Sequence, residues 1–172
     1  MKRVALTIGA LAIFGMIPAA AHAGELFGGV YVHDVETPLT ASGIERGLDL
    51  QIGWRGGRIG STPLQPYVFG ALNTSGETNY AAVGVSAKFG GQLYVRPGLG
   101  LAIHSGSSGN FTRPDRIAFG SRVLFEPELA VGMQVNDRVS VEASWVHMSH
   151  AQLFGRQNPG IDNFGVRFNL GF

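Results

Sequence analysis

A histidine and a serine two residues apart, His147 and Ser149, are the residues whose types and spacing suggest chemistry. On a β-strand, side chains at positions i and i+2 leave the same face, so the imidazole and the hydroxyl would lie together. A histidine beside a serine, with a carboxylate approaching from elsewhere, can form a base-activated hydroxyl nucleophile. By itself the pattern is weak evidence for catalysis, so the elements that surround it must decide.

The first 23 residues have the features of a secretory signal peptide. Lys2 and Arg3 precede an apolar run, a proline and the cleavage motif Ala21-His22-Ala23. The apolar run is shorter than the ~20 residues that a membrane-spanning helix needs, which disfavours an uncleaved anchor. We therefore expect residues 1–23 to be removed and residues 24–172 to form one domain.

The composition excludes several classes of protein. The chain has no cysteine, so an exported domain would have to be stable without disulfides. A formal net charge of +1 gives no electrostatic case for binding nucleic acid. Twenty-six glycines and eight prolines argue against long helices. Hydrophobic residues make up 45% of the chain and alternate with polar ones, which is typical of a membrane β-barrel.

Alternation of apolar and polar residues predicts about eight strands. It is clearest in the last segment, where Phe164, Val166, Phe168, Leu170 and Phe172 alternate with small and polar residues. The predicted strands are approximately 26–34, 44–54, 64–73, 83–89, 91–104, 117–134, 139–145 and 164–172. Eight strands lie near the lower limit for a closed membrane barrel.

A soluble β-sandwich or a lipocalin-like barrel would also alternate. However, the faces opposite the apolar rows carry many charges, which suit the interior of a small outer-membrane barrel better than a soluble core. These charged residues are Arg122, Glu126, Glu128, Glu142 and Arg167. The aromatic ending at Phe172 also resembles the C-terminal assembly signal of bacterial outer-membrane proteins. We therefore predict an all-β fold, an eight-stranded antiparallel transmembrane β-barrel of the outer membrane.

In an even-stranded barrel both termini lie on the periplasmic side, so the seventh strand runs outward. Its outer end carries His147 and Ser149, which would lie at the outer leaflet, where Gram-negative bacteria have lipopolysaccharide. Both share the phase of Trp145, on the face predicted to meet lipid, and Asp162 shares the lipid-facing phase of the last strand. Polar groups facing lipid are costly, so three that converge there require an explanation. Trp145 itself fits the aromatic belt at the outer interface.

The segments His147-Met148-Ser149 and Asn158-Pro159-Gly160-Ile161-Asp162, followed by the terminal aromatic strand, resemble the lipid A 3-O-deacylase (PagL) family of outer-membrane serine hydrolases. The resemblance implies that Ser149 is the nucleophile, His147 the base and Asp162 the acid that orients it. It also implies the substrate, the ester-linked 3-hydroxyacyl chain at position 3 of lipid A. No metal or other cofactor is implied.

The sequence departs from the family pattern near the expected oxyanion hole. His150 stands where well-known members have asparagine, Gln152 stands where glycine is frequent, and Asp162 is a glutamate in some members. Backbone N–H groups of Ala151 or Gln152 are candidate oxyanion donors. His150 has the opposite phase to His147 and is a candidate for positioning. A metal site built from His147, His150 and His104 is disfavoured, because their strands and phases differ.

Two other functions remain open at this stage. A non-enzymatic small barrel, serving as a structural, adhesion or pore protein, explains the alternation equally well but not a lipid-facing His147 and Ser149 beside Asp162. An outer-membrane esterase or phospholipase would share the chemistry and differ in substrate. The expected partners are lipopolysaccharide and membrane lipids, and both a monomer and a homodimer are compatible with the sequence. Loop cations are candidates for contacting lipid A phosphates or for ordinary solvation: Arg113, Arg116 and Arg156.

Overall fold

A computed structural model of the chain describes residues 24–40, 43–109, 115–153 and 158–172, so the predicted signal peptide lies outside the described residues. The described residues form only strands, turns and irregular segments. None of them belongs to a helix long and apolar enough to cross a membrane. The strands are β1 (Gly24–Val32), β2 (Leu48–Gly56), β3 (Leu64–Asn73), β4 (Tyr80–Ala87), β5 (Phe89–Gly90), β6 (Leu93–His104), β7 (Val123–Gln134), β8 (Val139–Met148) and β9 (Ile161–Gly171).

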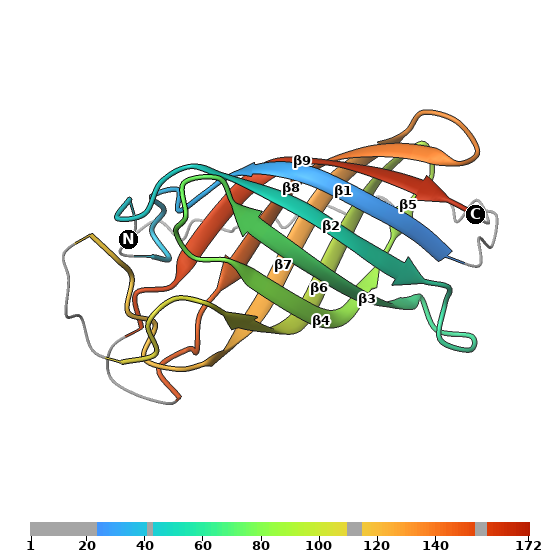
Figure 1. Ribbon diagram of the computed structural model, residues 1–172. Helices are drawn as coiled ribbons and strands as arrows, with labels where there is room; N and C mark the ends of the chain where they lie inside the picture. Colours follow the sequence, from blue (N-terminus) through green and yellow to red (C-terminus); the bar gives the residue numbers. More distant parts are fainter. Residues whose placement is uncertain (1–23, 41–42, 110–114, 154–157) are drawn as a thin grey trace, which may run out of the picture.

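The strands close into a barrel (Figure 1). The order β4-β3-β2-β1-β9-β8-β7-β6-β5 is closed by pairing between β4 and β6, and every pairing of these strands is antiparallel. The two-residue β5 follows β4 after Lys88 and pairs with the same neighbour, β6, so the two together act as one strand. The prediction of an eight-stranded antiparallel barrel is confirmed.

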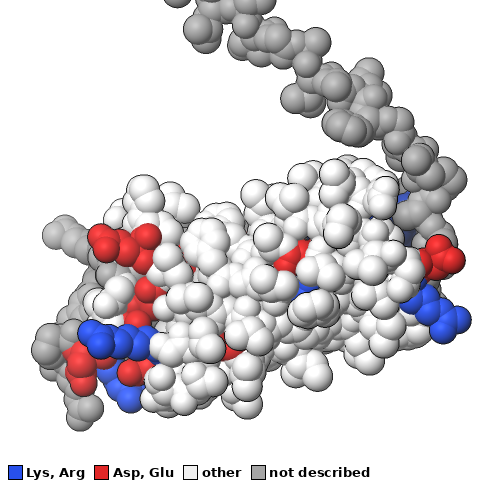
Figure 2. Space-filling model, turned by 90° about the horizontal axis from the view of Figure 1, so that it is seen from above, with Lys and Arg blue, Asp and Glu red and all other residues white. Residues whose placement is uncertain are grey.

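Successive side chains of each strand alternate between the barrel's interior and its outer wall. In β9 the pattern is clear: Arg167 and Asn169 are buried, whereas Phe164, Phe168 and Leu170 are exposed. In Figure 2 the wall between the two ends of the molecule is almost free of charged residues, which gather mainly at the ends. An apolar wall around a polar interior is the arrangement that a bilayer requires.

The interior of the described barrel contains a network of ion pairs beside a cluster of buried apolar side chains. Arg167 lies 2.7 Å from Glu128 and 3.6 Å from Glu142, and Arg96 lies 3.0 Å from Glu142. Because buried charges are tolerated only when they are paired, this network supports the prediction of a charge-paired interior. One member was predicted wrongly. Arg122 lies in a loop, where its guanidinium donates to the backbone oxygens of His104 and Gly106.

Two predicted strands begin later than the alternation suggests. β2 starts at Leu48 rather than Ile44, because Gly47 has a φ of +104°, outside the strand region. β7 starts at Val123 rather than near residue 117. Ile117 and Phe119, predicted to face lipid, are instead buried in the hydrophobic cluster inside the barrel. They alternate like strand residues, but they lie in the connection before β7, where the N–H groups of Ile117 and Phe119 donate to Glu45 and to the Ser107 oxygen.

The barrel has two unlike ends. At the short-turn end, residues 57–63, 91–92 and 135–138 connect neighbouring strands, and the backbone N–H of Phe172 donates to the oxygen of Gly24. At the opposite, long-loop end lie the connections 33–47, 74–79, 105–122 and 149–160. The predicted chemical residues His147, Ser149 and Asp162 all lie at the long-loop end, on β8, β9 and the segment between them.

Candidate functional site

His147 and Asp162 are brought together by the pairing of two neighbouring strands. They occupy directly opposite positions in the ladder between β8 and β9, one pair beyond Val146 and Asn163. Directly opposite residues of an antiparallel pair have Cβ atoms about 4.5–5.5 Å apart. The short aspartate side chain can therefore reach the imidazole without any distortion of the strands.

The three predicted residues form one continuous hydrogen-bonded chain. His147 Nδ1 lies 2.9 Å from Asp162 Oδ1, and His147 Nε2 lies 3.0 Å from Ser149 Oγ. With Nδ1 protonated and facing the carboxylate, Nε2 is left as the acceptor for the serine hydroxyl. The imidazole therefore has the orientation in which it can remove the proton from Ser149.

Backbone geometry holds both ends of this chain. Ser149 follows β8 and forms a bridge with Phe125, in which each backbone N–H donates to the other's oxygen. Gly160, two residues before Asp162, has a φ of +65°, and an added Cβ there would lie 3.3 Å from His147 Cε1. A glycine at this position therefore adopts the positive φ without strain and also leaves room for the imidazole.

Two further side chains hold the carboxylate of Asp162. Trp145 donates its indole N–H to Oδ1 at 2.7 Å, and the Thr37 hydroxyl donates to Oδ2 in a short hydrogen bond. The carboxylate is fully buried, so these donors replace the water that it would otherwise bind. Neither role was predicted from the sequence, since Trp145 was expected in the aromatic belt and Thr37 carries no local signal.

Thr37 belongs to the loop 33–47, whose start is fixed by a buried charge cluster. His33 lies 3.0 Å from Glu45 and 2.9 Å from Asp49. Burial alone would lower the pKa of His33, but the hydrogen bonds and charges of the two carboxylates outweigh it and raise the pKa to about 9. Burial likewise opposes ionisation of Glu45, yet the bonds from His33 and Thr78 hold its pKa below the ordinary value. The loop thus begins with a charged, fully partnered histidine.

The candidate oxyanion residues lie in a tight turn directly after Ser149. Ala151 and Gln152 have φ values of +52° and +60°, and Leu153 N–H donates to the His150 oxygen, as in a type I′ turn. The backbone N–H of His150 donates to the Asn158 side chain, and the residue is buried. Among the described residues, the N–H groups of Ala151 and Gln152 have no hydrogen-bond partner.

Only one of the three predicted loop cations lies among the described residues. Arg113 and Arg156 lie outside the described residues. Arg116 is exposed, lies 3.7 Å from Glu77 and donates to the Gly76 oxygen. These contacts are typical of a solvated loop charge. In the described part of the chain, no group of three or more histidine and acidic side chains is arranged to hold a metal ion.

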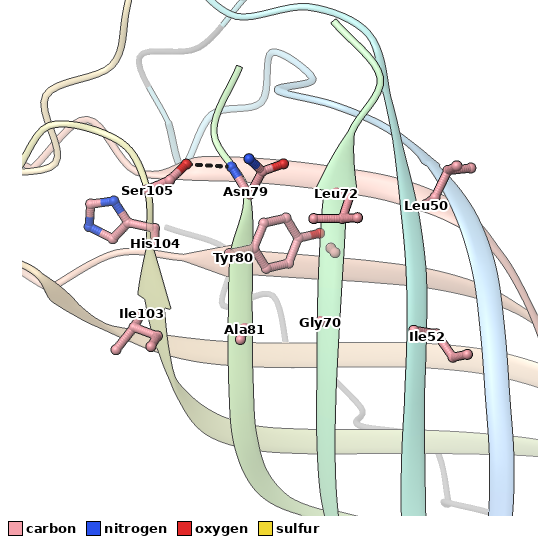
Figure 3. Close-up of a pocket in the computed structure, with 11 residues that line it drawn as sticks. Leu50, Ile52, Gly70, Leu72, Asn79, Tyr80, Ala81, Ile103, His104 and Ser105 are labelled. Atoms are coloured by element: carbon pink, nitrogen blue, oxygen red, sulfur yellow. Dashed lines mark hydrogen bonds between the residues drawn. The ribbon is translucent and has the colours of Figure 1, made fainter. Parts of the chain in front are cut away.

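A shallow depression on the outer wall lies well away from His147, Ser149 and Asp162. Its floor is made by Gly70 and Ala81, which are cross-strand partners on β3 and β4, and Ile52 and Ile103 stand on its two sides (Figure 3). In the closed order of strands, β3 and β4 are opposite β8 and β9. The depression is therefore not part of the candidate site.

Sequence comparison decides the family. Residues 42–170, more than half of the chain, match the model of the family described as lipid A 3-O-deacylase (PagL). The chain belongs to the lipid A 3-O-deacylase (PagL) family. Its members are hydrolases, and membership together with the barrel fold places the protein in the bacterial outer membrane. No curated protein sequence matches the chain.

Solved structures agree with the fold expected of the PagL family. The crystal structure of the outer membrane enzyme PagL is similar with a TM-score of 0.62 and 18% sequence identity, covering 86% of this chain and 99% of that one. The crystal structure of Neisserial surface protein A (NspA) is similar with a TM-score of 0.53 and 15% identity, covering 87% of this chain and 97% of that one. At these identities the likeness supports the fold alone.

Proposed function

We propose that this protein is a serine esterase that hydrolyses the ester-linked 3-hydroxyacyl chain at position 3 of lipid A. Ser149 is the nucleophile, His147 the general base and Asp162 the acid that orients the base. The observation that carries the proposal is the unbroken set of hydrogen bonds from Asp162 Oδ1 through the imidazole to Ser149 Oγ. Family membership supports the substrate.

The reaction begins with proton transfer from Ser149 Oγ to His147 Nε2, while the oxygen attacks the ester carbonyl. Asp162 holds the proton on Nδ1 and offsets the charge that the imidazole gains. The oxyanion of the tetrahedral intermediate would accept hydrogen bonds from the backbone N–H groups of Ala151 and Gln152. Protonated His147 then gives its proton to the leaving sugar hydroxyl, and an acyl-serine remains.

Water completes the reaction by the same route in reverse. His147 removes a proton from the water, the resulting hydroxide attacks the acyl-serine, and the 3-hydroxy fatty acid leaves as Ser149 regains its proton. Both half-reactions use the same base, His147, whereas the nucleophile is Ser149 in the first and water in the second.

The direction of the side chains suits a lipid substrate. His147 and Ser149 have the outward phase of Trp145 on β8, and long loops of outer-membrane barrels are extracellular, whereas the turns at the other end are short. The site would then open toward the outer leaflet. A lipid A molecule could present its acyl ester from the side while it stays in the membrane.

The proposal is tested by expressing the chain in a Gram-negative host that lacks this activity and measuring the lipid A by mass spectrometry. We expect loss of one 3-hydroxyacyl chain from lipid A, with phospholipids unchanged. Unchanged lipid A together with released phospholipid fatty acids would assign the site to a phospholipase. Unchanged lipids of both kinds would favour a non-enzymatic barrel.

A further inference from the structure

The loop 33–47 contributes a hydroxyl to the candidate site with a defined direction. The backbone N–H of Leu39 donates to Thr37 Oγ1 at 3.1 Å, so the threonine oxygen already accepts one hydrogen bond. Its own proton is then free to point at Asp162 Oδ2, with which it forms a short hydrogen bond. Thr37 therefore acts toward Asp162 as a donor.

This bond holds Oδ2, the carboxylate oxygen that the other donors do not bind. His147 and Trp145 both bind Oδ1, and Thr37 is the partner that the described residues offer to Oδ2. The terminal torsion of an aspartate is broad, so bonds to one oxygen alone leave the carboxylate free to swing. With both oxygens held, Oδ1 stays directed at the imidazole.

The loop is also tied to the backbone oxygen of Asp162 and to the side chain of the next residue, Asn163. The backbone N–H of Val35 donates to the backbone oxygen of Asp162 at 2.7 Å, and the backbone N–H of Asp34 donates to Asn163 Oδ1 at 2.9 Å. Asp34 in turn accepts bonds from the N–H groups of Ile44 and Glu45, which close the loop on itself. These bonds give Thr37 a fixed position, as a site-building element requires.

We propose that Thr37 is a positioning residue of the esterase, which sets the activity of Ser149 by holding the carboxylate of Asp162 toward His147. The inference rests on the proposed function for the identity of the nucleophile. It adds that the first long loop, more than a hundred residues from Ser149 in the sequence, is part of the catalytic unit.

The test compares Thr37→Val, which removes the hydroxyl at nearly constant shape, with Thr37→Ser, which restores it. Thr74→Val is the matched control, since the Thr74 hydroxyl also accepts a backbone N–H, from Leu48, in another long-end loop. Each variant is checked for heat-modifiable migration. Two rates are then measured in detergent: deacylation of lipid A, and covalent labelling of Ser149 by a fluorophosphonate, which needs no lipid substrate.

We expect Thr37→Val to lower kcat and the labelling rate about 10- to 100-fold, the size of one hydrogen bond to a charged group, with little change in KM. Thr37→Ser should recover most of both rates, and Thr74→Val should keep both. In an Asp162→Ala background, adding Thr37→Val should change the labelling rate less than about twofold, because residues that act through one partner are not additive.

The outcomes separate this inference from the proposed function. If a folded Thr37→Val protein labels and deacylates like the wild type, or if its effect persists undiminished in Asp162→Ala, Thr37 does not act through the acid. If lipid A is not a substrate but labelling of Ser149 still depends on the Thr37 hydroxyl, the positioning role holds and the substrate assignment fails.

Discussion

His147 and Asp162 are directly opposite each other in the ladder between β8 and β9, with Nδ1 and Oδ1 2.9 Å apart. At this register the short side chain of an aspartate reaches the imidazole. The carboxylate is fully buried and holds three hydrogen bonds, so an added methylene would have to displace its partners. The pairing of the strands thus places the carboxylate of Asp162 against the imidazole of the proposed base.

Substitution of Asp162 should separate its charge from its shape. Asp162→Asn keeps the size but cannot offset the imidazolium, so we expect kcat to fall about 10³- to 10⁴-fold, as in other serine hydrolases. Asp162→Glu keeps the charge but overfills the site, and should be impaired less. The measurement is the lipid A deacylation rate of heat-modifiable protein. An Asp162→Asn enzyme with near wild-type kcat would remove Asp162 from the mechanism.

Gly160→Ala should impair catalysis by crowding the imidazole and the loop 33–47. The added Cβ would lie 3.0 Å from Thr40 Cγ2 and 3.3 Å from His147 Cε1, and the backbone has a φ of +65°. Gly76→Ala is a matched control, because its φ of +76° imposes a similar strain while nothing lies within 4 Å of the new carbon. We expect a loss of activity of about 10-fold or more for Gly160→Ala alone. Equal losses in both variants would attribute the effect to backbone strain.

The cluster around His33 should make the long-loop end sensitive to alkali. A free histidine has a pKa of about 6.5, whereas His33 between Glu45 and Asp49 has a pKa raised to about 9. The folded protein therefore holds a proton that the unfolded chain releases. The resulting stabilisation is complete below about pH 6.5 and is lost as the pH rises through about 9.

Two measurements check this expectation. The His33 ring resonance in detergent micelles, identified by its absence in His33→Gln, should titrate with a midpoint near pH 9. The unfolding temperature of the wild type should fall more between pH 7 and pH 10 than that of His33→Gln. A midpoint at or below the value of a free histidine would show that the two carboxylates do not hold the proton.

The sequence predicted those parts of the molecule that depend on local periodicity. The alternation of β9 gave its outward face, and spacing by two placed His147 and Ser149 on one side, because a strand has a period of two. The closeness of Asp162 followed from its place at the start of the neighbouring strand. The closed eight-stranded barrel followed from the number of such segments.

What the sequence could not predict depends on contacts between distant segments. Thr37 reaches Asp162 across 125 residues. It lies in a loop, where no periodicity tells a side chain's direction. Ile117 and Phe119 alternate as strand residues do, yet both are buried in the hydrophobic cluster, so that burying their apolar surface outweighs continuing the ladder. Arg55 on β2 reaches Glu128 on β7 across the closed barrel, and Arg96 on β6 reaches Glu142 on β8 past the intervening strand β7.

The most direct test of the account is the mass of purified lipid A after incubation with wild-type protein and with Ser149→Ala in the same detergent. Both proteins should migrate as folded, heat-modifiable barrels, because the Ser149 backbone bridge to Phe125 does not need the hydroxyl. The account predicts that the wild type removes one 3-hydroxyacyl chain and that Ser149→Ala removes none above background. Deacylation by folded Ser149→Ala at the wild-type rate would contradict it.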